Sequence, residues 1–314
     1  MKYGFGIDLG GTTVKLAYFD ENGTMLHKWE IPTNTAEGGS QILPDIAKAV
    51  EGYLGENNIP RESIIGLGIG VPGPVDVNGT VNKCVNLGWG RFNISRELER
   101  LTGFPVQAGN DANVAAMGEF WKGGGQGCRN MVLATLGTGV GGGIVVEGKL
   151  LCGSQGAGGE IGHMTINRDE TVPCNCGKYG CVEQYCSATG VVRTAKRYMA
   201  KNDAPSCLRD IENLTCKDVF DAGAKGDAVA VEILEIVYRD LAVFLGNLCV
   251  TVDPDVVVIG GGVSKAGQPL LDGIRKYLPQ YQIHATRNVE LSLATLGNDA
   301  GAYGACKLVL DAGK

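Results

Sequence analysis

The sequence predicts an α/β protein built from two similar halves. Short apolar segments alternate with longer segments of helical pattern, which is typical of α/β folds. Each half opens with the same design: an apolar strand, a glycine-rich turn and a second apolar strand, over residues 3–20 and 131–146. Although the repeat is loose, the shared opening indicates a duplicated α/β domain.

In the first half, the segment 3–20 predicts two strands around a tight turn at Gly10 and Gly11. The residues from Asp20 to Gly23 are typical of a hairpin turn, so a third strand should continue through Glu30. The other expected elements are a helix over 46–54, a buried strand over 64–70, a short helix over 95–101, a strand over 106–109 and a helix over 111–121.

The second half begins after a glycine-rich run over 121–127, which is the best internal boundary. Its hairpin over 131–146 ends at the turn Glu147-Gly148. The elements expected beyond it are helices near 183–200 and 227–248, a buried strand over 256–259 and a final helix over about 300–310.

Composition excludes several classes of protein. The chain has 314 residues, enough for two domains, and a net charge of −6 without a long basic run, which argues against nucleic-acid binding. We find no signal-peptide pattern before Tyr3 and no apolar stretch of membrane-spanning length. Eleven cysteines, many of them single in apolar segments, fit a reducing compartment. We therefore expect a cytoplasmic protein with no membrane partner.

Glycine-rich turns at three places could face a phosphorylated ligand. The turn from Asp8 to Lys15 offers backbone N–H groups and threonine hydroxyls to an anion, and the Asp8 carboxylate could hold Mg²⁺ through water. An ordinary hairpin is the alternative. Gly137-Thr138-Gly139 mirrors this turn, and Gly260-Gly261-Gly262 ends a buried strand, where ligands commonly meet an α/β sheet. No helix follows the first two turns directly, so neither is a P-loop or a dinucleotide fingerprint.

A histidine and three cysteines lie close together in the second half. His163 is followed by Cys174, Cys176 and Cys181, a Cys3His set that suits a closed, structural zinc site. Unrelated buried thiols or a disulfide between two of them are the alternatives. Such a zinc would bring together the residues that flank the set, Glu160 and Glu183. His163 could use one nitrogen for the metal and the other for a ligand.

The segment Gly109-Asn110-Asp111-Ala112-Asn113 lies where a strand should meet a helix. Asn and Asp there are ordinary N-cap residues. An aspartate at such a junction can also act as the general base that accepts a substrate's hydroxyl proton during phosphoryl transfer. The residues alone leave both readings open.

Taken together, these motifs resemble the ROK family (repressors, open reading frames, kinases), and most closely its bacterial glucokinases. The resemblance covers essentially the whole chain and is most specific over Gly158–His163 and Cys174–Glu183. It implies an actin-like ATPase (ribonuclease H-like) fold with a cleft between two domains. The N-terminal domain would span 1–120, rejoined by the final helix at about 299–314, and the C-terminal domain 121–298.

The resemblance also implies a role for each motif. Asp111 would be the base acting on the sugar 6-hydroxyl, and the structural zinc would lie on the four residues of the Cys3His set. The other sugar ligands would be Asn86, Asn110, Glu160, His163 and Glu183. ATP would contact Asp8, Gly10, Gly11, Thr12, Thr13, Lys15, Gly137, Thr138 and Gly139 through its phosphates and Gly260, Gly261 and Gly262 through its adenosine.

The function expected from these motifs is ATP-dependent phosphorylation of a hexose, with glucose as the first choice. Other substrates within this class are N-acetylmannosamine, fructose, mannose and allose, and polyphosphate is the alternative donor. Family repressors carry an N-terminal DNA-binding extension, for which we expect no room because the first hairpin begins by residue 5. A sugar-binding regulator without catalysis is less consistent with intact Asp8 and Asp111. The resemblance also favours a homodimer.

Overall fold

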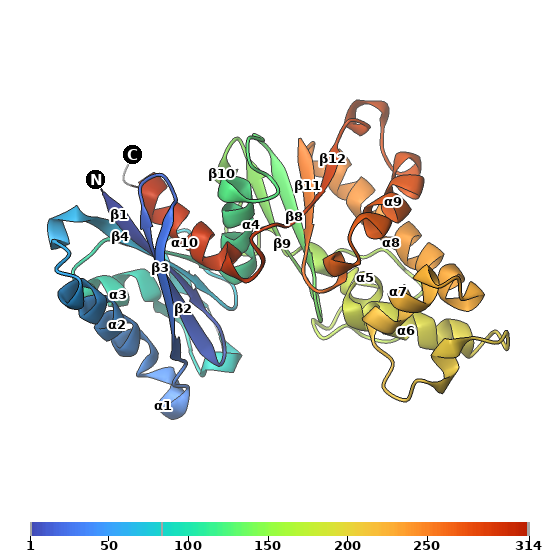
Figure 1. Cartoon of the computed structure of the whole chain (residues 1–314), viewed down its shortest axis with the longest axis horizontal. Coiled ribbons are helices and arrows are strands. Elements are labelled where there is room, and N and C mark those ends of the chain that lie inside the picture. Colours follow the sequence, from blue (N-terminus) through green and yellow to red (C-terminus); the bar gives the residue numbers. More distant parts are fainter. Residues whose placement is uncertain (1, 83, 313–314) are drawn as a thin grey trace.

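The computed structural model describes residues 2–82 and 84–312, which form two lobes joined through the helices α4 and α10 (Figure 1). Each lobe is built on a five-stranded sheet within this described part of the chain. The first sheet contains β1 (Tyr3–Leu9), β2 (Thr13–Asp20), β3 (Met25–Pro32), β4 (Ile64–Val71) and β7 (Val106–Asn110). The second contains β8 (Met131–Leu136), β9 (Val140–Val146), β10 (Lys149–Leu150), β11 (Val256–Gly260) and β12 (Glu290–Leu293).

The two sheets have the same topology. Their strand orders are β3-β2-β1-β4-β7 and β10-β9-β8-β11-β12. In each, the first three strands form an antiparallel meander, while the fourth strand pairs in parallel with the first and the fifth in parallel with the fourth. The duplicated α/β fold predicted from the two hairpins is therefore confirmed.

Local chemistry explains why the first meander forms where it does. The turn between β1 and β2 is closed by a hydrogen bond from the Gly10 N–H to the Thr13 carbonyl, 3.0 Å long. In the next turn, Asp20 Oδ1 accepts from the N–H groups of Asn22 (2.9 Å) and Thr24 (2.8 Å). An aspartate that accepts from backbone N–H groups a few residues ahead stabilises a turn, as the sequence predicted.

The helices differ from the sequence expectation in several places. They are α1 (Ala36–Gly39), α2 (Ile42–Glu56), α3 (Ile94–Thr102), α4 (Asp111–Lys122), α5 (Glu183–Cys186), α6 (Ala188–Met199), α7 (Cys216–Ala224), α8 (Ala228–Val252), α9 (Gln268–Tyr277) and α10 (Ala300–Ala312). The helix expected over 46–54 starts earlier, at Ile42. Helices α7 and α9 and the short strands β10 and β12 were not predicted.

The single helix expected near 183–200 is wrong, because Ser187 divides it into α5 and α6. Ser187 has an extended backbone (φ −74°, ψ 168°), and its hydroxyl accepts a hydrogen bond from the Gly190 N–H at 2.9 Å. Serine caps helices in this way when its own backbone leaves the helical region. The break turns the chain between the two short helices.

The last helix, α10, packs against β1 and β4 of the first sheet and against α4 (Figure 1). The approach to the sheet is so close that a Cβ on Gly68 would lie 1.7 Å from the carbonyl oxygen of Ala305. Helix α4 also contacts β9 of the second sheet, so α4 and α10 together connect the lobes. Residues 313–314 of the expected segment 299–314 lie outside the described residues.

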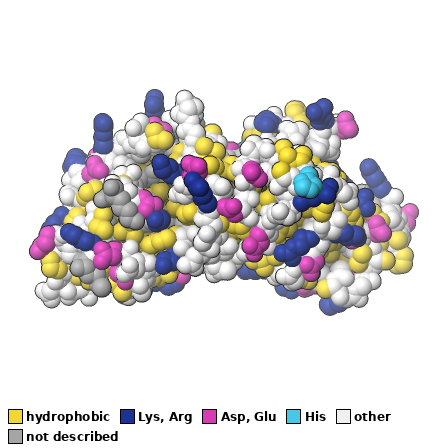
Figure 2. Space-filling view, turned by 90° about the horizontal axis from the view of Figure 1, so that it is seen from above, with side chains coloured by type: hydrophobic (Ala, Val, Ile, Leu, Met, Phe, Trp, Pro, Cys, Tyr) yellow, Lys and Arg dark blue, Asp and Glu magenta, His cyan; other side chains and the backbone are white. Residues whose placement is uncertain are grey.

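Each lobe has its own apolar core. Phe5 and Ile7 are fully buried in the first, and Val257 and Ile259 in the second. In the described part of the chain, no helix combines the length and the apolar character needed to cross a bilayer. On the face shown in Figure 2, Lys and Arg side chains are interspersed with Asp and Glu. Mixed charge of this kind does not favour phosphate-backbone binding on that face.

Candidate active site

Asn110 and Asp111 stand at the junction of β7 and α4, and Asn110 caps the helix. Asn110 is the N-cap: its Oδ1 accepts from the N–H groups of Ala112 (3.0 Å) and Asn113 (3.1 Å). Its Nδ2 donates to the Gly73 carbonyl at 3.1 Å and to Asp111 Oδ1 at 2.9 Å. The capping interpretation therefore holds for Asn110, and the next residue begins the helix with a side chain exposed to solvent.

The Asp111 carboxyl is influenced electrostatically by two other carboxylates. Desolvation by the surrounding protein raises the pKa of Asp111, although the residue itself is exposed, and the negative charges of Asp8 and Glu160 raise it further. The Ala112 N–H, 2.8 Å from Oδ1, acts in the opposite direction. A raised pKa beside specific charged partners is typical of functional sites. The three carboxylates come from the end of β1, the start of α4 and the loop before the 3₁₀ turn η3 (Ile161–His163).

Asn86, another predicted sugar ligand, lies on a short turn of the first lobe. Asn86 is exposed and lies in the 3₁₀ turn η2 (Val85–Leu87). Burial raises the pKa of the adjacent Cys84 thiol, and the charge of Asp111 adds to that shift.

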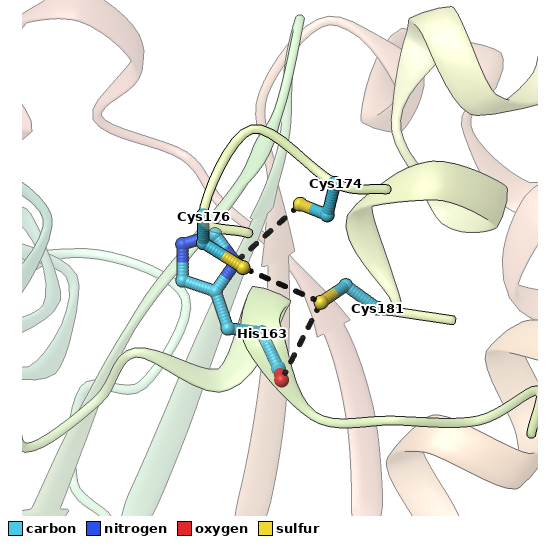
Figure 3. Close-up of side chains that lie close together, drawn as sticks. All are labelled: His163, Cys174, Cys176 and Cys181. Atoms are coloured by element: carbon cyan, nitrogen blue, oxygen red, sulfur yellow. Dashed lines mark hydrogen bonds between the residues drawn. The ribbon is translucent and has the colours of Figure 1, made fainter. Parts of the chain in front are cut away.

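The four residues of the predicted metal set come together in space (Figure 3). One ligand atom from each of His163, Cys174, Cys176 and Cys181 lies within 4.8 Å of the other three. The sulfurs of Cys176 and Cys181 are 3.7 Å apart, and Cys174 Sγ is 3.9 Å from His163 Nδ1. Tetrahedral zinc with Zn–S bonds of about 2.3 Å needs ligand sulfurs about 3.8 Å apart. The donor set and its spacing therefore fit a structural zinc ion.

The backbone shapes this loop for metal binding. The Gly177 N–H donates to the Cys174 carbonyl at 2.8 Å, which closes a turn that contains Cys176. Gly180 has a φ of +70°, and a Cβ there would lie 1.7 Å from the Asn167 carbonyl oxygen, so only glycine fits. Burial raises the pKa of the Cys174 and Cys181 thiols. A bound cation would favour their thiolate forms.

His163 presents its two ring nitrogens to different partners. Nδ1 faces Cys174 Sγ at 3.9 Å, while Nε2 lies 4.0 Å from Glu160 Oε2. A metal on Nδ1 would leave Nε2 on the side of Glu160, one of the carboxylates whose charge raises the pKa of Asp111. The arrangement links the metal set to the carboxylate cluster through one imidazole ring.

Glu183 connects the metal loop to the second glycine-rich turn. Its Oε2 accepts from the Val140 N–H at 3.0 Å, and its Oε1 lies 3.7 Å from Cys174 Sγ. A Cβ on Gly139 would meet Oε2 at 2.1 Å, so the carboxylate packs directly on the turn. In this conformation Glu183 supports the turn at Gly137–Gly139 while remaining next to the metal set.

The first glycine-rich turn is braced at both ends. The Thr33 hydroxyl donates to the Gly10 carbonyl at 2.8 Å, while a Cβ on Gly11 would meet only open space. Lys15 Nζ lies 3.4 Å from Asp8 Oδ2 and 3.3 Å from the carbonyl oxygen of Asn298. Thr12 and Thr13 complete the turn. Its exposed backbone and the nearby ammonium group could receive an anion.

A cavity of about 470 Å³ opens at the end of β11, bordered by Gly260, Gly261 and Gly262. Its lining also includes Asn298 in the 3₁₀ turn η8 (Gly297–Asp299), Ala300 at the start of α10, and Glu119 of α4. Its position at the carboxyl end of a parallel strand is where α/β sheets bind ligands. Sequence reasoning found the three glycines but missed further lining residues, which include Glu119, Ser264, Lys265 and Asn298. No local motif marks these residues.

Comparison with known proteins agrees with this architecture. The model of the ROK family matches residues 4–312. A glucokinase from Halalkalibacterium halodurans is 43% identical over 97% of this chain and 94% of its own length. An N-acetyl-D-glucosamine kinase from Yersinia pseudotuberculosis is 32% identical over 98% of each chain.

One solved structure allows the fold of this chain to be compared with that of a relative. It is a ROK family glucokinase from Streptomyces griseus in complex with glucose and AMPPNP, 34% identical, with a TM-score of 0.73 over 98% of each chain. The match confirms, for this chain's two lobes, the actin-like ATPase fold that the resemblance to the family implied. From the family match over nearly the full length and these relatives, the chain belongs to the ROK family.

Proposed function

We propose that this chain is a glucokinase, which transfers the γ-phosphoryl group of ATP to the 6-hydroxyl of glucose. The observation that carries the proposal is the Asp111 carboxylate at the start of α4, with its pKa raised by desolvation and by Asp8 and Glu160. The similar glucokinases and the glucose and AMPPNP complex of a relative support the choice of substrates.

The sugar would lie between Asp111 and the metal loop. Asp111 would accept the proton of the 6-hydroxyl as the phosphoryl group arrives. A sugar offers several hydroxyl groups, so its site needs polar partners from several segments. Asn110, which hydrogen-bonds to Asp111, would be one such partner, and Glu160 and Nε2 of His163 would be others. The remaining ligands in the proposal are Asn86 and Glu183. A structural zinc on His163 and the three cysteines would hold Glu160 and His163, which form one side of the sugar site, in place.

The nucleotide would lie across both glycine-rich turns. The turns at Gly10–Thr13 and Gly137–Gly139 would receive the phosphates, and the cavity at Gly260–Gly262 the adenosine. Lys15 adds positive charge at the first turn. Mg²⁺, when bound, would neutralise charge on the transferring phosphates, and the Asp8 carboxylate is the residue suited to hold it. Phosphoryl transfer asks mainly for such positioning and charge stabilisation.

An ADP-release assay over a panel of sugars tests the proposal. Glucose, mannose, fructose, allose, N-acetylglucosamine and N-acetylmannosamine would be compared with ATP as donor, and polyphosphate would replace ATP in a parallel series. We expect the highest kcat/KM with glucose and ATP. A higher value for an N-acetylhexosamine would reassign the substrate, and no sugar-dependent ADP release at all would contradict a kinase.

We further propose that the protein is a homodimer, as the resemblance to the family suggested. Size-exclusion chromatography with light scattering should give twice the mass of one chain. A single-chain mass at assay concentration would contradict this part of the proposal.

A further inference from the structure

A buried carboxylate lies inside the metal loop but outside the metal set. Glu170 stands between His163 and Cys174 in sequence, and its side chain is only 2% exposed. Burying a carboxylate is costly unless charged and hydrogen-bonding partners surround it. Glu170 has such partners, and they come from a different part of the second lobe.

The partners of Glu170 lie on α5 and α6. Arg197 forms two parallel hydrogen bonds to it, Nη1 to Oε2 at 2.8 Å and Nη2 to Oε1 at 3.0 Å. The Tyr185 hydroxyl donates to Oε2 at 2.5 Å, and Arg193 Nη2 lies 3.0 Å from the same oxygen. Hydrogen bonding from Arg197 holds the pKa of Glu170 well below its usual range, so the carboxylate stays ionised. A two-bond Arg–carboxylate pair is strong and fixes its geometry.

Further contacts join the same part of the loop to α5. Asn167 Nδ2 donates to the Tyr185 hydroxyl at 2.9 Å, and Gln184 Nε2 donates to the Val172 carbonyl at 2.9 Å. Glu170 Oε1 also accepts from the Val172 N–H at 2.9 Å, which shapes the loop around the carboxylate. None of these contacts uses a side chain of the metal set. The segment 167–172 is therefore held on α5 and α6 by interactions that need no metal.

The start of α6 reaches the second glycine-rich turn as well. The Ala188 N–H donates to the Gly137 carbonyl at 2.8 Å, and the Thr189 hydroxyl donates to the Thr138 carbonyl at 2.8 Å. The helix that receives Glu170 is thus the helix that supports the proposed phosphate turn. A loop fixed to α6 is fixed relative to that turn.

We propose that Glu170 is a positioning residue that anchors the metal loop to α6 independently of the metal. The metal joins His163 to the cysteines at one end of the loop, and Glu170 joins the middle of the loop to α6. Loss of either anchor should shift Glu160 and His163 while the loop stays folded, and loss of both should release the loop. The kinetic part of this inference depends on the proposed sugar-kinase function.

The kinetic test compares Glu170→Gln with Glu147→Gln, whose exposed carboxylate pairs with Arg129 on the surface. Glu170→Gln should raise the glucose KM about tenfold while kcat changes less than about twofold, the pattern of lost ground-state positioning. Zinc content should stay at one per chain. With a zinc chelator, the KM of Glu170→Gln should rise by more than the product of the two separate effects, because the anchors support each other. Glu147→Gln should match wild type throughout.

Limited trypsin digestion provides a readout that does not depend on sugar kinetics. The loop contains trypsin sites at Arg168 and Lys178. Cleavage there should stay slow in wild type with chelator and in Glu170→Gln with zinc, and become at least about tenfold faster only when both anchors are removed. If Glu170→Gln does not fold, Tyr185→Phe replaces it and should raise the glucose KM about two- to threefold.

The proposal would be overturned if Glu170→Gln, treated with chelator, kept the wild-type glucose KM and was still cleaved slowly. So would rapid cleavage of the chelated wild type, because the metal would then be the single anchor. If no sugar is phosphorylated, the digestion still decides whether Glu170 anchors the loop, so the two proposals fail separately.

Discussion

Removal of the Glu119 carboxylate should weaken the connection between the lobes. Glu119 is 1% exposed in α4 and accepts three backbone hydrogen bonds. Oε2 accepts from Gly124 (2.8 Å) and Thr295 (3.0 Å), and Oε1 accepts from Leu296 (2.9 Å). These donors lie on the two chain segments that leave α4 and approach α10. The Glu119 carboxylate therefore holds both of these connecting segments in place.

The magnitude follows from the hydrogen bonds lost. Glu119→Ala leaves three part-buried N–H groups without their carboxylate partner, at up to about 1–3 kcal/mol each. Because Glu119 borders the 470 Å³ cavity, water can reach part of the gap, and we expect a loss of about 3–6 kcal/mol. At about 2 °C per kcal/mol, the melting temperature should fall by about 6–12 °C. Glu119→Gln keeps one acceptor oxygen and should lose about 1–3 kcal/mol.

Thermal unfolding followed by circular dichroism, together with urea titration, measures this effect. Glu99→Ala is the matched control, because Glu99 is exposed and accepts one backbone hydrogen bond, from Val106 at 3.0 Å. The control should lose less than about 1 kcal/mol. A Glu119→Ala melting temperature within about 2 °C of wild type would refute the reasoning. The ATP KM should rise in the same variant, since the segment that Glu119 holds lines the cavity.

Three further predictions follow from packing, charge and metal binding. Activity needs the ionised form of Asp111, whose pKa is raised. As the pH decreases, kcat/KM should therefore begin to fall at a higher pH than it would with an aspartate of ordinary pKa, and a pH profile of kcat/KM measures this. Gly68→Ala should destabilise by at least about 1–3 kcal/mol in urea titration, since its Cβ would meet the Ala305 carbonyl, whereas Gly52→Ala on α2 has open space and should not destabilise. Cys176→Ala should lower the zinc content and raise the glucose KM, with the circular dichroism spectrum largely retained.

The parts of the fold that sequence predicted are those determined by local chemistry. Glycine and aspartate turns mark both hairpins, and the repeated hairpin indicated the duplicated sheets. The metal set was visible because three of its four ligands lie within eight residues, from Cys174 to Cys181. Strand β12 was missed because its four mixed residues show no clear period. Helix α9 was missed although its buried residues Leu270, Leu271, Ile274 and Tyr277 recur at helical spacing. The break at Ser187 was missed because serine occurs both inside helices and at their caps.

Other functional features depend on contacts between distant segments. Glu119 and Thr295 are 176 residues apart, and Glu170 and Arg197 are 27 apart. From sequence alone, a single charged residue in a helix or loop is expected to be solvent-exposed, because its partners are not known. The roles of Asn110 and Asp111 were open for a related reason, since only the observed hydrogen bonds show which of the two caps α4.

The most direct test of the central claim is the turnover of Asp111→Asn with glucose and ATP. Asparagine keeps the size of the side chain and an oxygen for the Ala112 N–H, but it cannot accept the hydroxyl proton. We expect kcat to fall by about 10²–10⁴-fold, while glucose binding by calorimetry changes little and the melting temperature does not fall. Turnover within about tenfold of wild type would contradict the assignment of Asp111 as the base.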